Sequence, residues 1–384
     1  MNRHACPSAL TAFTIWAFAS VAQAAALTPA TPASPARAAA ASPASPLRSV
    51  AAALPMANRG RTPGTSAPGT SVNTAYAQQA AAATLTAQSN PNCARARLGD
   101  YYWEVGDVNG VQVSGSVGTA IGATTGLSID SATKWVYASA AVQYYGGSVP
   151  AAQIPYLNFT SGYSNFGIGR CLPSDTVAGC IARNKPTLDS TAVGKFFYGA
   201  AHMQLHANDF MSLGPALNAG LNAGVLLPVF NISSLGTLGY SSPLMAGAVY
   251  TSASTYGSFL RRILSGTLLM KDALGTHKVC TNPRTCSTAK FSPMQKIDES
   301  WNYSLGHWVE DDPLLGDHAF SSGGAGGFYP WIDKNKTFYG VLARQTFAAG
   351  TNDGYVSAQC GRLIRQAFIT GVAVTTATKP TPAR

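Results

Sequence analysis

The chain has 384 residues, of which 46% are hydrophobic and only 11% are charged, well below the roughly 25% of an average soluble domain. Such a length suits one large domain or two small ones. The net charge of +10 arises mainly near the amino terminus, where seven Arg and no acidic residue precede Asp100. Residues 100–384 therefore carry 19 basic and 16 acidic residues. Since no basic run is visible, we expect no nucleic-acid partner.

Residues 1–24 have the pattern of a secretory signal. Arg3 and His4 form a basic start, an apolar run extends from Ala9 through Val21, and Ala22-Gln23-Ala24 supplies the small residues of a cleavage site. The alternative is a membrane anchor, but the run is shorter than the roughly 20 residues that a membrane span needs. We predict cleavage, a secreted or periplasmic location, and no stable membrane span afterwards.

Residues 25–90 consist mainly of Ala, Pro, Ser and Thr, without hydrophobic periodicity. Such a stretch buries too little apolar area to offset the entropy of ordering, so we predict a disordered linker. The folded domain is expected over residues 91–375, followed by a tail at 376–384.

The first predicted elements of this domain are a hairpin and a buried helix. Tyr101–Val105 is aromatic-rich and strand-like, and Asn109–Gly110 favours the tight turn before a returning strand at Val111–Val113. The Ala-, Val- and aromatic-rich run from Ser131 to Tyr145 indicates a buried helix that ends at Gly146-Gly147.

The remaining predicted elements alternate less regularly. In chain order they are helices at Phe196–Gly214 and Tyr256–Leu274, strands at Ser304–Glu310, Gly326–Ile332 and Phe338–Ala343, and a helix at Asp353–Ile369. Strands near both ends with helices between them predict an α/β (α+β) fold, in which an antiparallel sheet formed from both chain ends is flanked by helices and carries a mainly helical insert.

Six cysteines remain if Cys6 leaves with the signal, and six permit 15 pairings. Two pairs are close in sequence and would each close a loop: Cys171 with Cys180, and Cys280 with Cys286. By elimination, Cys93 would then pair with Cys360 and tie the domain's ends together. The alternative is a metal site, but no CxxC pair or His-x-x-x-His cluster supports one, so we expect no metal.

The sequence Ser131-Ala132-Thr133-Lys134 places Ser and Lys on one helical face at the start of the buried helix. Unpaired backbone N–H groups there favour a developing oxyanion, and burial lowers the pKa of the Lys so that a neutral amine can act as base. A solvated helix start is the alternative interpretation. A second such motif, Ser287 to Lys290, lies in a polar loop after Cys286 with no apolar helix behind it, so the context favours Ser131 as nucleophile.

G-x-S-x-G, P-loop and dinucleotide-binding motifs are absent. A set of five segments occurs in this order along the chain: Ile129–Trp135, Tyr156–Tyr163, Phe196–Gln204, Tyr303–Val309 and Phe320–Asp333. Their order resembles the serine β-lactamase and penicillin-binding-protein superfamily, on the side of the class C β-lactamases, D-alanyl-D-alanine carboxypeptidases and related esterases.

This resemblance implies a serine hydrolase that forms an acyl-enzyme on Ser131 and needs no cofactor. Lys134 and Tyr198 would share proton transfer, the phenol having a pKa lowered by the lysine cation. Backbone N–H groups of Ser131 and of one residue among Gly323, Gly324 and Ala325 would form the oxyanion hole. The substrate would be a small-molecule or peptide ester or amide.

Two departures from the family pattern bear on the substrate. Ala200 stands where the second motif usually has Asn, and the third motif reads Ser321-Ser322-Gly323, or begins at Ser322, without the usual cation that receives a substrate carboxylate. These departures favour an ester or a less acidic amide. They also leave an alternative function, a catalytically weak penicillin-binding-like protein that recognises a cell-wall peptide or partner. His202 is expected to be structural.

Overall fold

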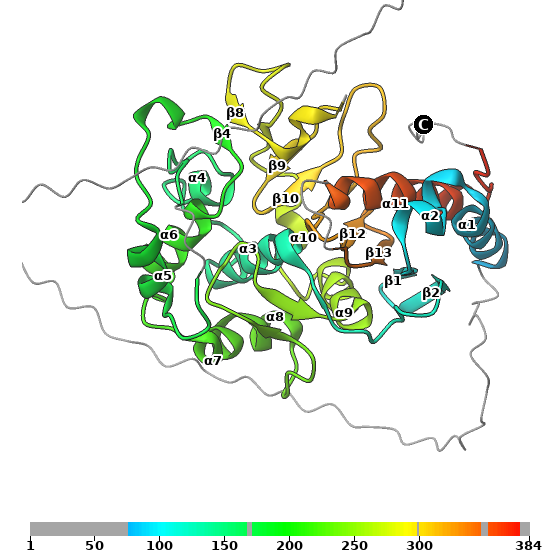
Figure 1. Ribbon diagram of the computed structural model, residues 1–384, viewed down its shortest axis with the longest axis horizontal. Helices are drawn as coiled ribbons and strands as arrows, with labels where there is room; N and C mark the ends of the chain where they lie inside the picture. The colour runs from blue at the N-terminus through cyan, green and yellow to red at the C-terminus, as the bar shows by residue number, and fades with distance from the viewer. Residues whose placement is uncertain (1–75, 167–170, 298, 347–351, 377–384) are drawn as a thin grey trace, which may run out of the picture. The chain divides into compact units, whose positions relative to one another are not determined.

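The structure is a computed structural model that describes residues 76–166, 171–297, 299–346 and 352–376 (Figure 1). The predicted signal at 1–24 and most of the predicted linker and tail lie outside these residues. Within them, no helix is long and apolar enough to cross a membrane. No group of three or more metal-ligating side chains was found in the same ranges.

An eight-stranded antiparallel sheet forms the centre of the fold. Its strands, in spatial order, are β2 (Gly110–Val117), β1 (Tyr101–Asp107), β13 (Tyr339–Ala343), β12 (Tyr329–Ile332), β11 (Phe320–Ser321), β10 (His307–Val309), β9 (Asn302–Ser304) and β7 (Val279–Cys280). The first predicted strand thus pairs directly with the last one, Trp103 opposite Leu342. The predicted α+β fold, with one antiparallel sheet built from both ends of the chain, is confirmed.

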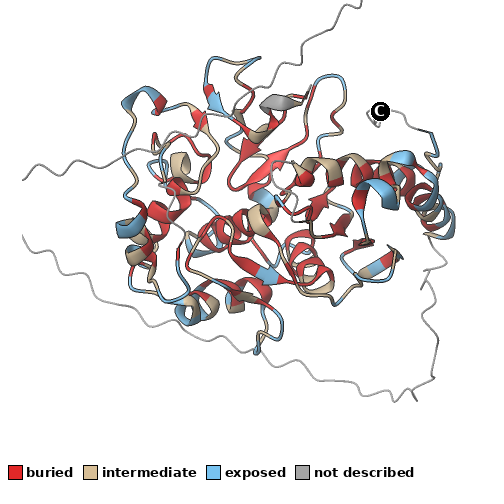
Figure 2. Cartoon of the chain, viewed as in Figure 1, coloured by how far each residue is buried: buried red, intermediate tan, exposed pale blue. Residues whose placement is uncertain are grey.

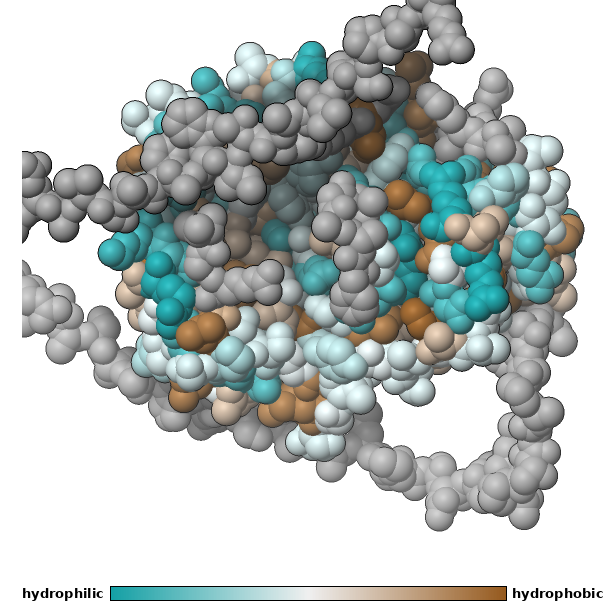
Figure 3. All heavy atoms as spheres, viewed as in Figure 1, coloured by the Kyte–Doolittle hydropathy of each residue, from teal (hydrophilic) through white to brown (hydrophobic). Residues whose placement is uncertain are grey.

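Helices cover both faces of this sheet (Figure 1). On one face lies α9 (Ala253–Leu264), whose Gly257 faces Glu104 and Tyr339; on the other lies α11 (Asp353–Thr370), whose Gly361 packs against Tyr329. Because both faces are covered, every residue of β1 is buried, as Figure 2 shows for most of the sheet. Hydrophilic residues gather over α2 (Arg95–Leu98) and α11 on the face seen in Figure 3.

Apart from β7, most of the elements between β2 and β9 in the chain belong to the insert. Its helices are α3 (Thr133–Tyr144), α4 (Ile154–Leu157), α5 (Val177–Asn184), α6 (Ala201–Asp209), α7 (Asn218–Leu221), α8 (Leu227–Phe230) and α10 (Met270–Ala273). Its short strands are β3 (Leu127–Ser128), β5 (Gly239–Tyr240) and β6 (Val249–Thr251) in one small sheet, and β4 (Phe196–Phe197) with β8 (Ala289–Phe291) in another. Helices predominate in the insert, as predicted.

One helix lies where the sequence predicted disorder. Residues Ala77–Ser89 form α1, which packs against α11 and buries Ala80, Ala83 and Ala87. The prediction of a linker up to residue 90 is therefore wrong over this range. The helix lacks an apolar stripe of large residues, but small Ala side chains let its backbone approach α11 closely.

Three other predicted elements have different bounds. The strand predicted at Ser304–Glu310 is the hairpin β9–β10, whose turn has Leu305 and Gly306 at positive φ (36° and 82°). A Cβ at Gly306 would lie 2.5 Å from Ala138 Cβ of α3, so this turn requires glycine. The helix predicted at Phe196–Gly214 is reduced to α6 after β4, and the one at Tyr256–Leu274 is divided into α9 and α10.

The three predicted disulfides are present: Cys93–Cys360, Cys171–Cys180 and Cys280–Cys286. The first has a sequence separation of 267 residues and joins the segment after α1 to the middle of α11. It thereby fixes the two ends of the domain against each other, as expected from the pairing by elimination.

Candidate active site

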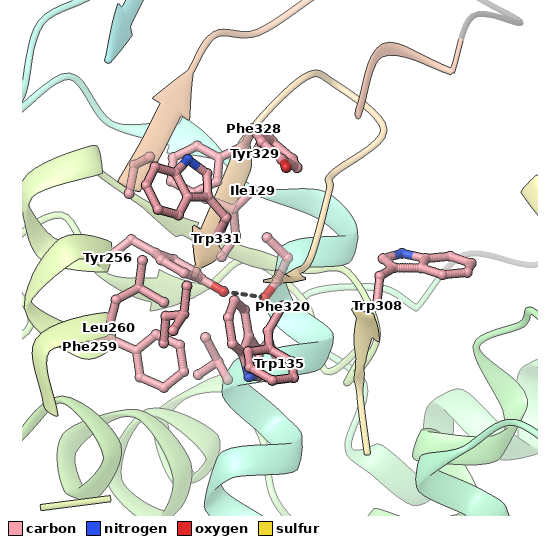
Figure 4. Close-up of a cluster of buried hydrophobic side chains, with 14 of the residues drawn as sticks. Ile129, Trp135, Tyr256, Phe259, Leu260, Trp308, Phe320, Phe328, Tyr329 and Trp331 are labelled. Atoms are coloured by element: carbon pink, nitrogen blue, oxygen red, sulfur yellow. Dashed lines mark hydrogen bonds between the residues drawn. The ribbon is translucent and has the colours of Figure 1, made fainter. Parts of the chain in front are cut away.

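The start of α3 supplies two of the predicted catalytic residues. Ser131 lies in a 3-10 turn, Asp130–Ala132, that leads into α3, whose residues from Thr133 to Val142 are all buried. Figure 4 shows Trp135 directed into the apolar core, and Tyr256 donating a hydrogen bond to the Ala132 carbonyl at 3.0 Å. Core packing thus fixes the helix start, while Ser131 itself remains partly exposed.

Lys134 lies directly behind Ser131. Its Nζ is hydrogen-bonded to Ser131 Oγ at 2.9 Å and donates to the Ala246 carbonyl at 2.6 Å. The side chain is 5% exposed, and burial lowers its pKa from 10.5 to about 7, while the Asp130 carboxylate acts in the opposite direction. A substantial fraction of the amine is therefore neutral near pH 7, and a neutral amine at this distance can accept the serine proton.

Tyr198 is the third predicted catalytic residue and meets the other two. Its ring centroid is 4.8 Å from Lys134 Nζ, and it stacks on Trp308 at 5.4 Å. We expected the lysine cation to lower the pKa of this phenol, and that expectation is wrong. Burial of the hydroxyl raises its pKa above the ordinary value, and only the hydrogen bond with Ser131 acts to lower it. Tyr198 therefore keeps its proton near neutral pH.

His202 is hydrogen-bonded to the residue before Tyr198. Its Nε2 lies 2.9 Å from the carbonyl of Phe197, and its Nδ1 lies 2.7 Å from Ser161 Oγ. Burial lowers the pKa of His202 to about 4, so the ring is neutral at physiological pH. A neutral ring that donates through Nε2 accepts the Ser161 hydroxyl through Nδ1. Both nitrogens therefore have protein partners, as expected for a structural histidine.

The third motif lies beside Ser131, but its residues have different positions. Gly323 and Ala325 line the cleft, whereas the Gly324 N–H donates to the Phe328 carbonyl at 2.7 Å. Ser322 Oγ lies 3.3 Å from the Ser131 carbonyl, to which it donates. Ser321 is fully buried on β11 opposite Trp308, and neither it nor Ser322 is among the residues that line the cleft.

Asp130 is a site residue that sequence reasoning missed. It precedes the candidate nucleophile and has a positive φ of 44°, a strained conformation that Asp tolerates better than most residues. Its Oδ2 accepts the Gly326 N–H at 2.7 Å, and its Oδ1 accepts the Ser128 hydroxyl at 2.9 Å. One carboxylate therefore joins the nucleophile turn to the glycine-rich segment. No local motif signals this role, because the partners are nearly 200 residues apart.

The cleft next to Ser131 has a volume of about 90 Å³ and is lined mainly by apolar and aromatic groups. Its lining residues are Ser131, Tyr198, Pro293, Met294, Trp301, Trp308, Gly323, Ala325, Tyr329, Asn352, Gly354 and Tyr355. None of these twelve residues is a Lys, Arg, Asp or Glu. The described lining of the cleft therefore offers no side-chain cation to a substrate carboxylate.

The alternative Ser-x-x-Lys motif has a different environment. Ser287 is exposed in a turn, and Lys290 Nζ contacts Asp189 Oδ2 at 2.9 Å and Thr191 Oγ1 at 2.6 Å. The Lys290 amine is thus exposed and directed to Asp189 and Thr191, whereas the Lys134 amine is buried directly behind its serine. The geometry thus favours Ser131 over Ser287.

No protein-family model matches the sequence, and no curated protein matches it either. Solved structures do. EstCE1, a hydrolase with promiscuous acyltransferase activity, has a TM-score of 0.53 at 13% identity, covering 77% of this chain and 100% of its own. A Bacteroides dorei protein assigned as a β-lactamase has a TM-score of 0.50 at 18% identity, covering 71% of this chain and 94% of its own.

A third similar structure is the D-amino acid amidase of Ochrobactrum anthropi, with a TM-score of 0.50 at 13% identity, covering 75% of this chain and 97% of its own. At these identities the likeness shows the fold. The chain has the fold of the β-lactamase, penicillin-binding-protein, amidase and esterase group, which confirms the resemblance seen in the sequence motifs.

Proposed function

We propose that this chain of β-lactamase fold is a serine hydrolase that cleaves an ester or a weakly acidic amide through an acyl-Ser131 intermediate. The observation that carries the proposal is the 2.9 Å contact between Ser131 Oγ and the buried Lys134 amine, whose pKa of about 7 makes the neutral base available. The predicted signal and the three disulfides support a secreted or periplasmic site of action.

In the proposed reaction, the Lys134 amine removes the proton from Ser131 while Oγ attacks the substrate carbonyl. The negative charge on the former carbonyl oxygen is stabilised by backbone N–H groups, those of Ser131 and of Gly323 or Ala325. Gly324, one of the three earlier candidates, is less suitable because its N–H already has the Phe328 carbonyl as partner.

Collapse of this intermediate expels the alcohol or amine, which needs a proton. Tyr198, protonated and hydrogen-bonded to Ser131, is suited to relay that proton from Lys134 to the leaving group. Water then attacks the acyl-enzyme with the same residues acting in reverse, and the acid is released.

The second candidate function is a penicillin-binding-like protein that recognises a cell-wall peptide or partner without efficient turnover. Ala200 in place of the usual Asn favours this alternative, and so does the lack of a Lys, Arg, Asp or Glu among the described residues that line the cleft. The buried base beside Ser131 favours catalysis, because an amine with a pKa near 7 has no evident use in binding alone.

The test is covalent labelling of the mature protein with a fluorophosphonate, followed by mass spectrometry of the peptides. We expect one adduct on Ser131, loss of labelling and of ester hydrolysis in Ser131→Ala, and unchanged labelling in the matched control Ser287→Ala. An unlabelled Ser131, or full ester hydrolysis by Ser131→Ala, would contradict the assignment of Ser131 as nucleophile. Labelling without multiple turnover would favour the binding alternative.

A further inference from the structure

A single buried carboxylate holds two walls of the cleft. Glu299 is 4% exposed, and its Oε2 accepts the indole N–H of Trp301 at 2.9 Å. Its Oε1 accepts the hydroxyl of Tyr355 at 2.7 Å. Both rings line the cleft, yet they come from different elements, Trp301 from the segment before β9 and Tyr355 from the first turn of α11. Glu299 thus fixes the distance between two walls that the chain itself does not connect.

The position of Glu299 is in turn fixed by α11. Arg362 donates to Glu299 Oε2 at 2.7 Å, and its guanidinium lies 5.5 Å from the centroid of the Trp301 ring. Arg362 is 1% exposed and also faces Glu310, with Nε 3.3 Å from Oε2. A carboxylate hydrogen-bonded by a guanidinium, an indole and a phenol has little freedom to move.

The same buried network reaches a third wall. Glu310 is fully buried and accepts the hydroxyl of Tyr329, a cleft residue, at 2.6 Å. Arg365 of α11 donates to both Glu310 Oε2 at 2.8 Å and the Tyr329 hydroxyl at 2.9 Å. Three aromatic side chains of the cleft are therefore anchored through their polar atoms to charges beneath them, and present their apolar faces to the cavity.

These anchored rings determine which substrate groups the cleft can accommodate. Trp301 lies 6.2 Å from Trp308 and 6.0 Å from Tyr355 between ring centroids, and Met294 and Pro293 complete an apolar surface beside Ser131. A substrate carboxylate placed here would lose water without gaining a cation among the lining residues, which is costly. An uncharged aromatic or aliphatic group would instead gain from burial against the rings.

We propose that Glu299 is a positioning residue for specificity, which holds Trp301 and Tyr355 so that the cleft selects esters or amides carrying an uncharged aromatic or medium-length aliphatic group. The inference rests on the proposed function for its reaction. It concerns a different part of the site, since Glu299 contacts the walls and not Ser131, Lys134 or Tyr198.

The test compares Glu299→Gln and Tyr355→Phe with wild type on p-nitrophenyl acetate, butyrate, hexanoate, phenylacetate and succinate. Wild type should prefer hexanoate or phenylacetate to acetate, and disfavour the anionic succinate. Both variants should lose about threefold to tenfold of the hexanoate-to-acetate preference in kcat/KM, mainly through KM, as expected when one anchoring hydrogen bond is lost. In the double variant the two effects should sum to less than full additivity, because both changes act on the Glu299–Tyr355 hydrogen bond.

The matched control is Glu104→Gln. Glu104 is an equally buried carboxylate that accepts a Tyr hydroxyl, from Tyr102 at 2.9 Å, but it lies on β1 and contributes nothing to the cleft. Its substrate profile should match wild type. If Glu299→Gln fails to fold, Tyr355→Phe alone decides, since it keeps the ring and every charge. An unchanged profile in Tyr355→Phe, or an equal change in the control, would overturn the proposal.

A binding measurement separates this inference from the proposed reaction. In Ser131→Ala, tryptophan fluorescence titrated with p-nitrophenyl hexanoate reports occupancy without turnover. Weaker binding after adding Tyr355→Phe would support the cleft assignment even if Ser131 proved unreactive. Equal affinity for hexanoate, acetate and succinate in Ser131→Ala would contradict the cleft assignment, even if Ser131 were labelled normally.

Discussion

The pH dependence of acylation tests the role assigned to Lys134. Burial lowers the pKa of its amine from 10.5 to about 7, so about half of the amine is neutral at pH 7. An ordinary lysine would be neutral in only about one molecule in three thousand at that pH, so burial raises the amount of usable base by roughly a thousandfold. Since only the neutral form accepts the serine proton, the rate should rise as pH increases through about 7 and level off above it.

Two substitutions sharpen this test. In Lys134→Arg the side chain stays protonated, so the rate should fall by about 10²- to 10⁴-fold, the usual contribution of a general base. In Asp130→Asn the pKa of Lys134 should fall, because the Asp130 carboxylate raises it, and the rising limb should move to lower pH. Asn tolerates the positive φ at this position, and its amide oxygen can still accept the Gly326 N–H.

The assay is the second-order rate of fluorophosphonate labelling of Ser131 between pH 5 and 9, measured by intact-mass spectrometry, together with kcat/KM for p-nitrophenyl acetate. Below pH 7 the wild-type rate should drop about tenfold per unit. A flat profile from pH 5 to 9, an undiminished rate in Lys134→Arg, or an upward shift of the limb in Asp130→Asn would refute the reasoning.

Three further predictions concern the leaving group, the long disulfide and the first helix. Tyr198→Phe should slow hydrolysis of ethyl esters at least tenfold more than of p-nitrophenyl esters with the same acyl group, because p-nitrophenolate leaves without a proton; equal slowing would argue against the relay. Replacing Cys93 and Cys360 by Ser should lower the free energy of unfolding by about 3–5 kcal/mol, measured as a lower midpoint of urea denaturation. Reducing agent should then lower the midpoint less in this variant than in wild type, because the long disulfide is already absent. Ala83→Leu should cost about 1–3 kcal/mol in the same measurement by overpacking α1 on α11, whereas Ala81→Leu, at an exposed position of α1, should cost less than 0.5 kcal/mol.

Short sequence patterns predicted the elements that neighbouring residues determine, namely the first hairpin and the last helix. The aromatic-rich strand and the Asn109–Gly110 turn identified the β1–β2 hairpin, and the helix predicted at Asp353–Ile369 matches α11 almost to the residue. The turn at Leu305 was missed because leucine rarely adopts a positive φ; packing of Gly306 against α3 imposes that conformation.

The candidate site also contains residues that sequence spacing predicted and residues that it did not. Ser131 and Lys134 are three residues apart on one helix, so their contact follows from sequence spacing. Asp130 and Glu299 carry no comparable signal, because a single acidic residue indicates a role only when its distant partners are known. The direction of the pKa shift of Tyr198 was also inaccessible, since it depends on how deeply the folded chain buries the hydroxyl.

The pairing of β1 with β13 has a consequence for how the chain is made. Synthesis delivers β1 more than 230 residues before β13, so the emerging polypeptide presents an aromatic strand with β2 on one edge and nothing on the other. The Ser131 site is likewise incomplete until Gly323 and the start of α11 have been translated. Chains stopped before residue 339 should therefore be inactive and prone to aggregate. Under the proposed function, ester hydrolysis should appear only once the chain has been translated through α11.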